Sequence, residues 1–215
     1  MNEFHFTNCI EIKELLGLKA DDELKLLELL EEVPIDSIYF HMHSYFLRHV
    51  YVSGIYPNDF ANWTAIQVRD RVLGEKLASV TPNRNLSLED LRYELIDIID
   101  KHLHDMKIIP SSVTYGEPFY FMKSQIIEVP TNIKVKNLKE FIAALKIVDA
   151  GSIYNHIFES QIRLKRRSND FSIWLEDILE LKELANKIEQ LDSYMFTLEG
   201  LREKLIDLCS GELNK

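Results

Sequence analysis

The sequence predicts a mainly helical protein built from two tandem copies of one repeat. Residues 37–41 read Ser-Ile-Tyr-Phe-His, and residues 152–156 read Ser-Ile-Tyr-Asn-His. A second phrase follows each of them, Asn-Asp-Phe-Ala-Asn-Trp at 58–63 and Asn-Asp-Phe-Ser-Ile-Trp at 169–174. Between these phrases, apolar residues recur at the spacing of one helix face. We therefore predict that each copy is a short extended segment plus four helices. The copies are expected to pack as one pseudo-two-fold body, with a small sheet at their Phe-x-Phe segments.

The first element of each copy is expected to be a short strand. Aromatic residues alternate at 4–6 and at the equivalent residues 119–121, and 126–129 add an apolar run typical of a strand. A short strand is unstable alone, so each segment is expected to pair either with the other one or with the residues that follow it, and we predict a small sheet that joins the two copies. Gly17 and Asn132 are expected to form tight turns after them, because both residue types tolerate a left-handed backbone.

Each helix is expected to begin after a side chain that can cap it. For the first, second and fourth helices the expected caps are Asp22 and Asn137, Ser37 and Ser152, and Ser87 and Thr197. The third helix is expected to begin at Asn-Asp-Phe in each copy, with Asn58 and Asn169 among its expected caps, and to place its Phe and Trp in the core. We predict a first repeat over 1–105, a linker over 106–118 and a second repeat over 119–215, forming one compact unit.

Bulk properties exclude several classes of partner. The formal net charge is −10, which argues against nucleic acid or an anionic membrane as the main partner. No apolar run approaches the roughly 18 residues that cross a bilayer. The start, Met-Asn-Glu, lacks a basic leader and an apolar stretch, so we expect a cytoplasmic protein. There is no glycine-rich phosphate loop or clustered metal-ligand pattern, and the sequence identifies no cofactor.

The main site candidates are His41 and His156, which both copies share. In one interpretation each is a half-buried imidazole bonded to a backbone carbonyl or a nearby carboxylate. In the other they bind a metal or an anionic ligand, or act as acid and base, near the axis between the copies. Asp59 and Asp170 stand at helix starts. They are expected to be caps, or else the carboxylates that orient the two histidines.

The first copy adds two further candidate ligands, His43 and His49. On a helix, His41 and His43 point in different directions, which makes shared metal ligation poor. His102 and His104 have the same spacing, and we expect them to be solvated.

The second copy contributes Glu159 and Arg163, four residues apart and expected to form an ion pair on one helix face. The basic run over 163–167 is expected to be a solvated loop. It could alternatively receive an anionic partner, although the net negative charge argues against a nucleic-acid adaptor.

The two duplicated phrases resemble those of a family of uncharacterised prokaryotic proteins, a domain of unknown function. The motifs that carry the resemblance are residues 37–43, His49 and 58–63 in the first copy, and residues within 152–174 in the second, and the resemblance extends over nearly the whole chain. The chain departs from the family pattern at Phe40 and Asn155, where tyrosine is expected. The resemblance implies no activity, and it adds interest to the first-copy histidines.

Two functional interpretations remain open on the sequence. The first is a non-catalytic binding or protein-interaction module, with self-association as a homodimer expected. The second is a metal- or ligand-binding enzyme with a histidine site between the two repeats. The sequence does not decide whether the protein is an enzyme.

Overall fold

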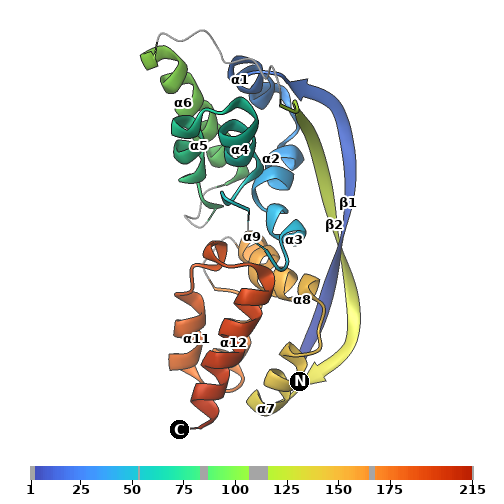
Figure 1. The fold of residues 1–215 in the computed structure, drawn as a ribbon. Helices are drawn as coiled ribbons and strands as arrows, with labels where there is room; N and C mark the ends of the chain where they lie inside the picture. Colours follow the sequence, from blue (N-terminus) through green and yellow to red (C-terminus); the bar gives the residue numbers. More distant parts are fainter. Residues whose placement is uncertain (1–2, 53, 83–86, 107–115, 165–167, 215) are drawn as a thin grey trace. The chain divides into compact units, whose positions relative to one another are not determined.

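The computed structural model describes residues 3–52, 54–82, 87–106, 116–164 and 168–214 of the chain (Figure 1). Helices dominate, and the strands form one two-stranded antiparallel sheet, so the predicted fold class is confirmed at this level. Most of the predicted linker and the basic residues 165–167 lie outside the described part. None of the described helices is long and apolar enough to cross a membrane.

The chain divides into two compact units, and neither follows a single stretch of sequence. Unit 1 consists of Met1–Glu11, Phe46–Val52 and Ile126–Lys215, and unit 2 consists of Ile12–Tyr45 and Ser53–Gln125. The helices of unit 2 are α1 (Glu23–Glu32), α2 (Ile35–Met42), α4 (Asp59–Trp63), the π-helical η1 (Thr64–Val68), α5 (Arg71–Ala78) and α6 (Leu88–Met106). The helices of unit 1 are α7 (Leu138–Leu145), α8 (Ala150–Tyr154), the π-helical η3 (Asn155–Glu159), α9 (Ser160–Leu164), α10 (Asp170–Asp177), α11 (Lys182–Glu189), the 3-10 turn η4 (Ser193–Met195) and α12 (Leu198–Leu213). The short helix α3 (Tyr45–Arg48) contains the boundary at residue 46.

The two strands pair with each other, as predicted, but they are not short. Strand β1 (Phe4–Ala20) and strand β2 (Phe119–Val135) have 17 residues each. Pairing supplies the backbone hydrogen bonds that an isolated extended segment lacks, so both strands continue past the expected turns. Gly17 has the expected positive φ of 73°, yet it lies within β1 rather than in a turn. Asn132 lies within β2 and does not have a positive φ.

Each strand begins in one unit and ends in the other. Residues 3–11 of β1 belong with the helices of the second copy, whereas residues 119–125 of β2 belong with the helices of the first copy. The Phe-x-Phe segment of each copy therefore packs on the helices of the other copy.

Most of the expected helix N-caps are confirmed. In each of five confirmed caps the side chain accepts a backbone N–H bond three residues on: Asp22 from Lys25, Asn137 from Glu140, Asn58 from Ala61, Asn169 from Ser172, and Thr197 from Gly200. Ser87 likewise accepts from the N–H of Asp90 at 3.1 Å.

Ser37 and Ser152 are not caps, contrary to expectation. Helices α2 and α8 begin earlier, because Pro34 and Asp149 already have the extended backbone of a cap residue. Both serines therefore lie inside the first helical turn. Each is fully buried, and neither hydroxyl has a hydrogen-bond partner in the described structure.

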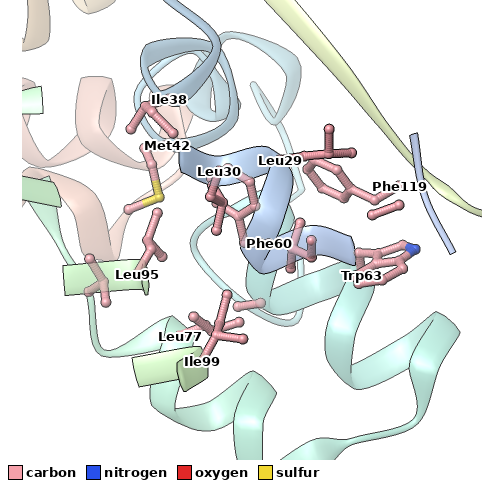
Figure 2. Close-up of a cluster of buried hydrophobic side chains, with 14 of the residues drawn as sticks. Leu29, Leu30, Ile38, Met42, Phe60, Trp63, Leu77, Leu95, Ile99 and Phe119 are labelled. Carbon is pink, nitrogen blue, oxygen red and sulfur yellow. The ribbon is translucent and has the colours of Figure 1, made fainter. Parts of the chain in front are cut away.

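The core of unit 2 gathers the residues that the helical spacing placed on one face. Phe60 and Trp63 of α4 pack with Phe119 of β2, and Leu29 and Leu30 of α1 lie beside them (Figure 2). The Phe60 and Phe119 rings stack with centroids 5.1 Å apart. The predicted core role of the Asn-Asp-Phe-x-x-Trp phrase is thus confirmed here.

Unit 1 has the equivalent core, but the strand that fills it comes from the start of the chain. Phe4 and Phe6 of β1 pack on Phe141 of α7 and on Phe171 and Trp174 of α10. Phe6 is almost fully buried and stacks on Phe141 with centroids 5.8 Å apart.

In each copy an arginine on the last helix, half-buried Arg92 or buried Arg202, bonds to a carbonyl at the end of the first helix. Arg202 of α12 is 9% exposed, donates to the carbonyl of Leu145 at the end of α7, and pairs with Glu199 one turn earlier at 2.7 Å. Arg92 of α6 donates to the carbonyl of Val33 at 2.8 Å in the same way. The guanidinium thus satisfies a helix-end carbonyl that has no intrahelical partner.

Replacing Arg202 with methionine is expected to lower the free energy of unfolding of unit 1 by about 2 kcal/mol, because the Leu145 carbonyl loses a charged donor. Urea unfolding followed by the fluorescence of Trp174 measures this change. Lys204→Met, on the exposed side of the same helix, is the matched control and is expected to have little effect. Equal stability of the two variants contradicts a structural role for Arg202.

Candidate functional site

In unit 2, His41 links a helix, a carboxylate and a strand. It lies near the end of α2, where its Nδ1 is 2.8 Å from Oδ2 of Asp59 at the start of α4. Its Nε2 accepts the backbone N–H of Met122 in β2 at 3.1 Å. The His41 side chain is almost completely buried, whereas that of Asp59 is about one quarter exposed, at 26%. His41 therefore holds β2 against the helices of the first copy.

In unit 1, His156 makes the same set of contacts. It lies in η3, and its Nδ1 is 2.9 Å from Oδ2 of Asp170 at the start of α10. Its Nε2 accepts the backbone N–H of Thr7 in β1 at 2.8 Å. Equivalent residues of the two copies thus form equivalent clusters, each within its own unit.

These bonds determine the protonation state of both rings. A backbone N–H can only donate, so Nε2 must present a lone pair to Met122 or Thr7. The ring proton then sits on Nδ1 and is donated to the aspartate. His41 and His156 are therefore neutral imidazoles with both nitrogens in use.

Aromatic rings enclose each imidazole. His41 lies 4.6 Å from Phe119 and 5.3 Å from Phe60, measured between ring centroids. His156 lies 4.8 Å from Phe4, with which it makes an edge contact. An aromatic shell of this kind removes the ring from water and strengthens the hydrogen bonds inside it.

The expected cap role of Asp59 and Asp170 is wrong. Asn58 and Asn169 cap α4 and α10, and each aspartate is the next residue, the first of its helix. Because the asparagine satisfies the helix N–H, the aspartate is available to orient the histidine. The geometry thus matches the alternative expectation, in which the two carboxylates orient His41 and His156.

His43 is buried in unit 2 and does not share ligands with His41. Its ring stacks on Tyr39 at 5.5 Å, with an angle of 14° between the planes, whereas His41 contacts β2. Burial lowers the pKa of His43 to about 3. In unit 1 the equivalent pair, Tyr154 and Phe158, stacks at 5.3 Å and 16°. His43 thus occupies a place that an apolar ring fills in the other copy.

The remaining candidates do not gather into a metal centre. His49 follows directly after α3 in the stretch Phe46–Val52 of unit 1, and Glu159 ends η3 in the same unit. Burial raises the pKa of Cys9 to about 12, and the nearby Glu159 adds to this rise. Arg163 lies on α9, but its side chain is outside the description, so the predicted ion pair stays a prediction. Among the described residues, no group of three or more His, Cys, Asp or Glu side chains could hold a metal ion.

The sequence interpretation missed a third histidine–aspartate pair. His102 was expected to be solvated, but it is buried, and its Nε2 lies 2.7 Å from Oδ2 of Asp70, the cap of α5. Lys76 approaches the other ring nitrogen at 3.4 Å. The signal was present, because His102 continues the apolar face of α6 that contains Leu95 and Ile99. His104, two residues on, is exposed as expected.

Comparisons with known proteins show a family and a fold, but no activity. The model of a family of unknown function, DUF5752, matches residues 1–210. The chain is similar to a solved structure described as the structure of OrfY from Thermoproteus tenax, with a TM-score of 0.79 and 20% sequence identity. The match covers 97% of this chain and 94% of that one, and at this identity it shows the fold alone. No curated protein matches.

Proposed function

We propose that the protein is a non-catalytic protein-interaction module. The chain belongs to DUF5752, a family of unknown function, so the proposal is argued from the structure. We propose further that it is a cytoplasmic, prokaryotic protein that associates as a homodimer. It consists in this proposal of two repeats, 1–105 and 119–215, joined by a linker over 106–118.

The observation that carries the proposal is the use of both nitrogens in each shared histidine. His41 and His156 bond to an aspartate on one side and to a strand N–H on the other. A general base or a metal ligand needs a lone pair directed at its target. Here that lone pair accepts a strand N–H instead. A structural role is therefore enough to explain why both copies contain this histidine.

An interaction role is supported by apolar side chains that are exposed on both faces of β1. In unit 2, Ile12 is 54% and Leu15 is 57% exposed, and Leu18 is also exposed. Large exposed apolar side chains on one element are typical of a surface that a protein partner covers. We assign a second copy of the chain as that partner, because most soluble oligomers are homo-oligomers.

Self-association is tested by sedimentation velocity over a range of concentrations. The wild type is expected to dimerise, and the Ile12→Glu, Leu15→Glu double variant to stay monomeric. Val72→Glu is the control, because Val72 is 55% exposed on α5 of the same unit. A monomeric wild type, or equal dimerisation of all three proteins, contradicts the proposed surface.

The alternative of a metal- or ligand-binding enzyme has two observations in its favour. His156 and Glu159 lie in a π-helical segment, and such segments occur frequently at functional sites. His156 with Asp170 also has the arrangement of a base and its orienting carboxylate. In this alternative the Thr7 N–H must leave Nε2 before the ring can act.

Elemental analysis of untagged, freshly purified protein separates the two functions. The interaction module is expected to carry no stoichiometric metal, and the His41→Ala, His156→Ala variant is expected to lose thermal stability. Stoichiometric metal in the wild type that is lost from a folded variant contradicts the proposal and favours the enzyme.

A further inference from the structure

The start of β1 occupies a built slot in unit 1. We call this site the strand slot and define it by Phe141, His156, Phe171 and Trp174. Phe4 contacts all four of these rings. The slot thus holds an aromatic side chain, and His156 accepts one backbone N–H from the same strand.

Further contacts extend along the strand on both sides of the slot. Glu3 pairs with Lys136 at 3.0 Å, and the Cys9 thiol donates to the carbonyl of Gly151 at 3.3 Å. The close approach at Gly151 leaves no room for a side chain, because an added Cβ lies 2.9 Å from the carbonyl oxygen of Cys9. The slot therefore recognises an extended backbone as well as its side chains.

Unit 2 contains a slot of the same chemistry with a different occupant. There Phe119 and Phe121 pack beside His41, and the Met122 N–H bonds to its Nε2. In both slots the bonded N–H lies three residues after the first Phe, and the residue between the two Phe side chains is exposed. Two different strands thus satisfy one rule: a Phe-x-Phe segment in extended form, with one N–H free to donate.

We propose that the strand slot of unit 1 is an exchangeable binding site, and that residues 3–9 of a second copy of this chain can occupy it. This inference rests on the proposed interaction function and names the segment that would be exchanged. The occupant of each slot already comes from the other repeat, and β1 leaves unit 1 as a continuous strand without a turn. Exchange replaces every slot contact with an identical one. Its free-energy cost is therefore only the translational and rotational freedom that two chains lose on association.

A peptide supplied in trans tests the slot directly. The full-length Phe4→Ala, Phe6→Ala variant keeps the slot and weakens its own strand. A labelled peptide of residues 3–12, carrying Cys9→Ser, is expected to bind it with one-to-one stoichiometry and to raise its melting temperature. Wild-type protein, whose slot is filled, is expected to bind about tenfold or more weakly.

Two control peptides distinguish specific recognition by the slot from non-specific binding. A peptide methylated on the backbone nitrogen of Thr7 cannot donate to His156, and one with Phe4→Ala and Phe6→Ala lacks the rings. Both are expected to lose binding by about tenfold or more. Absence of saturable binding, or equal binding by the control peptides, overturns the proposal. If the alanine variant does not fold, Phe4→Leu, Phe6→Leu replaces it.

Exchange between whole chains is then measured by mixing two variants. One chain carries Phe4→Ala, Phe6→Ala, and the other carries His156→Ala, Phe171→Ala, so only the first has an intact slot and only the second has an intact strand. Joint refolding is expected to give a one-to-one heterodimer in native mass spectrometry, and monomers alone overturn the exchange. If the peptide does not bind, but the wild type dimerises and the Ile12→Glu, Leu15→Glu variant does not, only this inference is overturned. If the peptide does not bind and the double variant also leaves dimerisation unchanged, the proposed function is contradicted as well.

Discussion

Replacing His156 with alanine is expected to lower the free energy of unfolding of unit 1 by on the order of 3 kcal/mol. The substitution removes the acceptor of the Thr7 N–H and the donor to Asp170. It also opens a space beside Phe4, which lies 4.8 Å from the imidazole. Asp170 is partly exposed and can recover water, so most of the loss comes from the strand N–H and the cavity.

The chain offers a separate fluorescent reporter for each unit. Trp174 lies in unit 1 and Trp63 in unit 2, and they are the only tryptophans of the sequence. In a Trp63→Phe background, urea unfolding followed by Trp174 fluorescence reports the stability of unit 1. Lys204→Ala is the control, because Lys204 is exposed on α12 of the same unit. A midpoint unchanged by His156→Ala contradicts the role of this histidine in holding β1.

A double-mutant cycle tests whether His156 and Asp170 act as one cluster. Asp170→Ala alone is expected to destabilise unit 1, but to have little further effect once His156 is alanine. A coupling free energy on the order of 1 kcal/mol is expected for this pair. Strict additivity contradicts the direct bond.

The equivalent cycle in unit 2 provides an internal repeat of the experiment. His41→Ala and Asp59→Ala, studied in a Trp174→Phe background, are expected to shift the Trp63 transition in the same way. The His156 and His41 effects are expected to appear in different transitions, because each imidazole is bonded within its own unit.

Local signals in the sequence were sufficient for most of the fold. Asp22, Asn137 and Thr197 cap their helices as expected, since an N-cap depends on residues only three positions apart. Phe60 and Phe171 are buried as expected, because helical spacing determines which side chains share a face.

Contacts between segments that are distant in the sequence were harder to predict. The Phe-x-Phe segments at 4–6 and 119–121 carry the same pattern, so either could pack on the helices of either copy. Nothing local distinguishes the two arrangements, and only the structure shows that each segment packs on the other copy's helices. Strand length was underestimated for a similar reason, because pairing extends β1 through exposed residues and β2 past the apolar run at 126–129.

The candidate site was predicted in its residues rather than in its bonds. The repeat singled out His41, His156 and the two aspartates, but both members of each Asn-Asp pair were expected to be caps. The sequence could not show that Asn58 and Asn169 alone take the capping role. It also could not show that the histidine acceptor is a strand N–H, since Thr7 and Met122 are distant in sequence from the histidines that they bond.

The protein is expected to lose stability as the pH falls below about 6.5, with His43 as one identifiable cause. Burial lowers the pKa of His43 to about 3 in the folded state, whereas an unfolded chain has the ordinary value near 6.5. Above pH 6.5 neither state binds this proton, and stability is complete. Between about 6.5 and 3 only the unfolded state binds it, so falling pH favours unfolding.

The size of this effect follows from the proton linkage. The free energy of unfolding of unit 2 is expected to fall through His43 by about 2 kcal/mol between pH 7 and pH 5, and by up to about 1.4 kcal/mol for each further pH unit. Urea unfolding at a series of pH values, followed by Trp63 fluorescence in the Trp174→Phe background, measures it.

The second copy supplies the matched variant for this measurement. Phe158 occupies the equivalent place and stacks on Tyr154 as His43 stacks on Tyr39, so His43→Phe is expected to fit. All other titrating groups are common to both proteins, and the difference between the two pH curves therefore isolates His43. The His43→Phe curve is expected to be flatter by the amount given above. Parallel curves contradict a neutral, buried His43 and mean that other groups cause the acid sensitivity of unit 2.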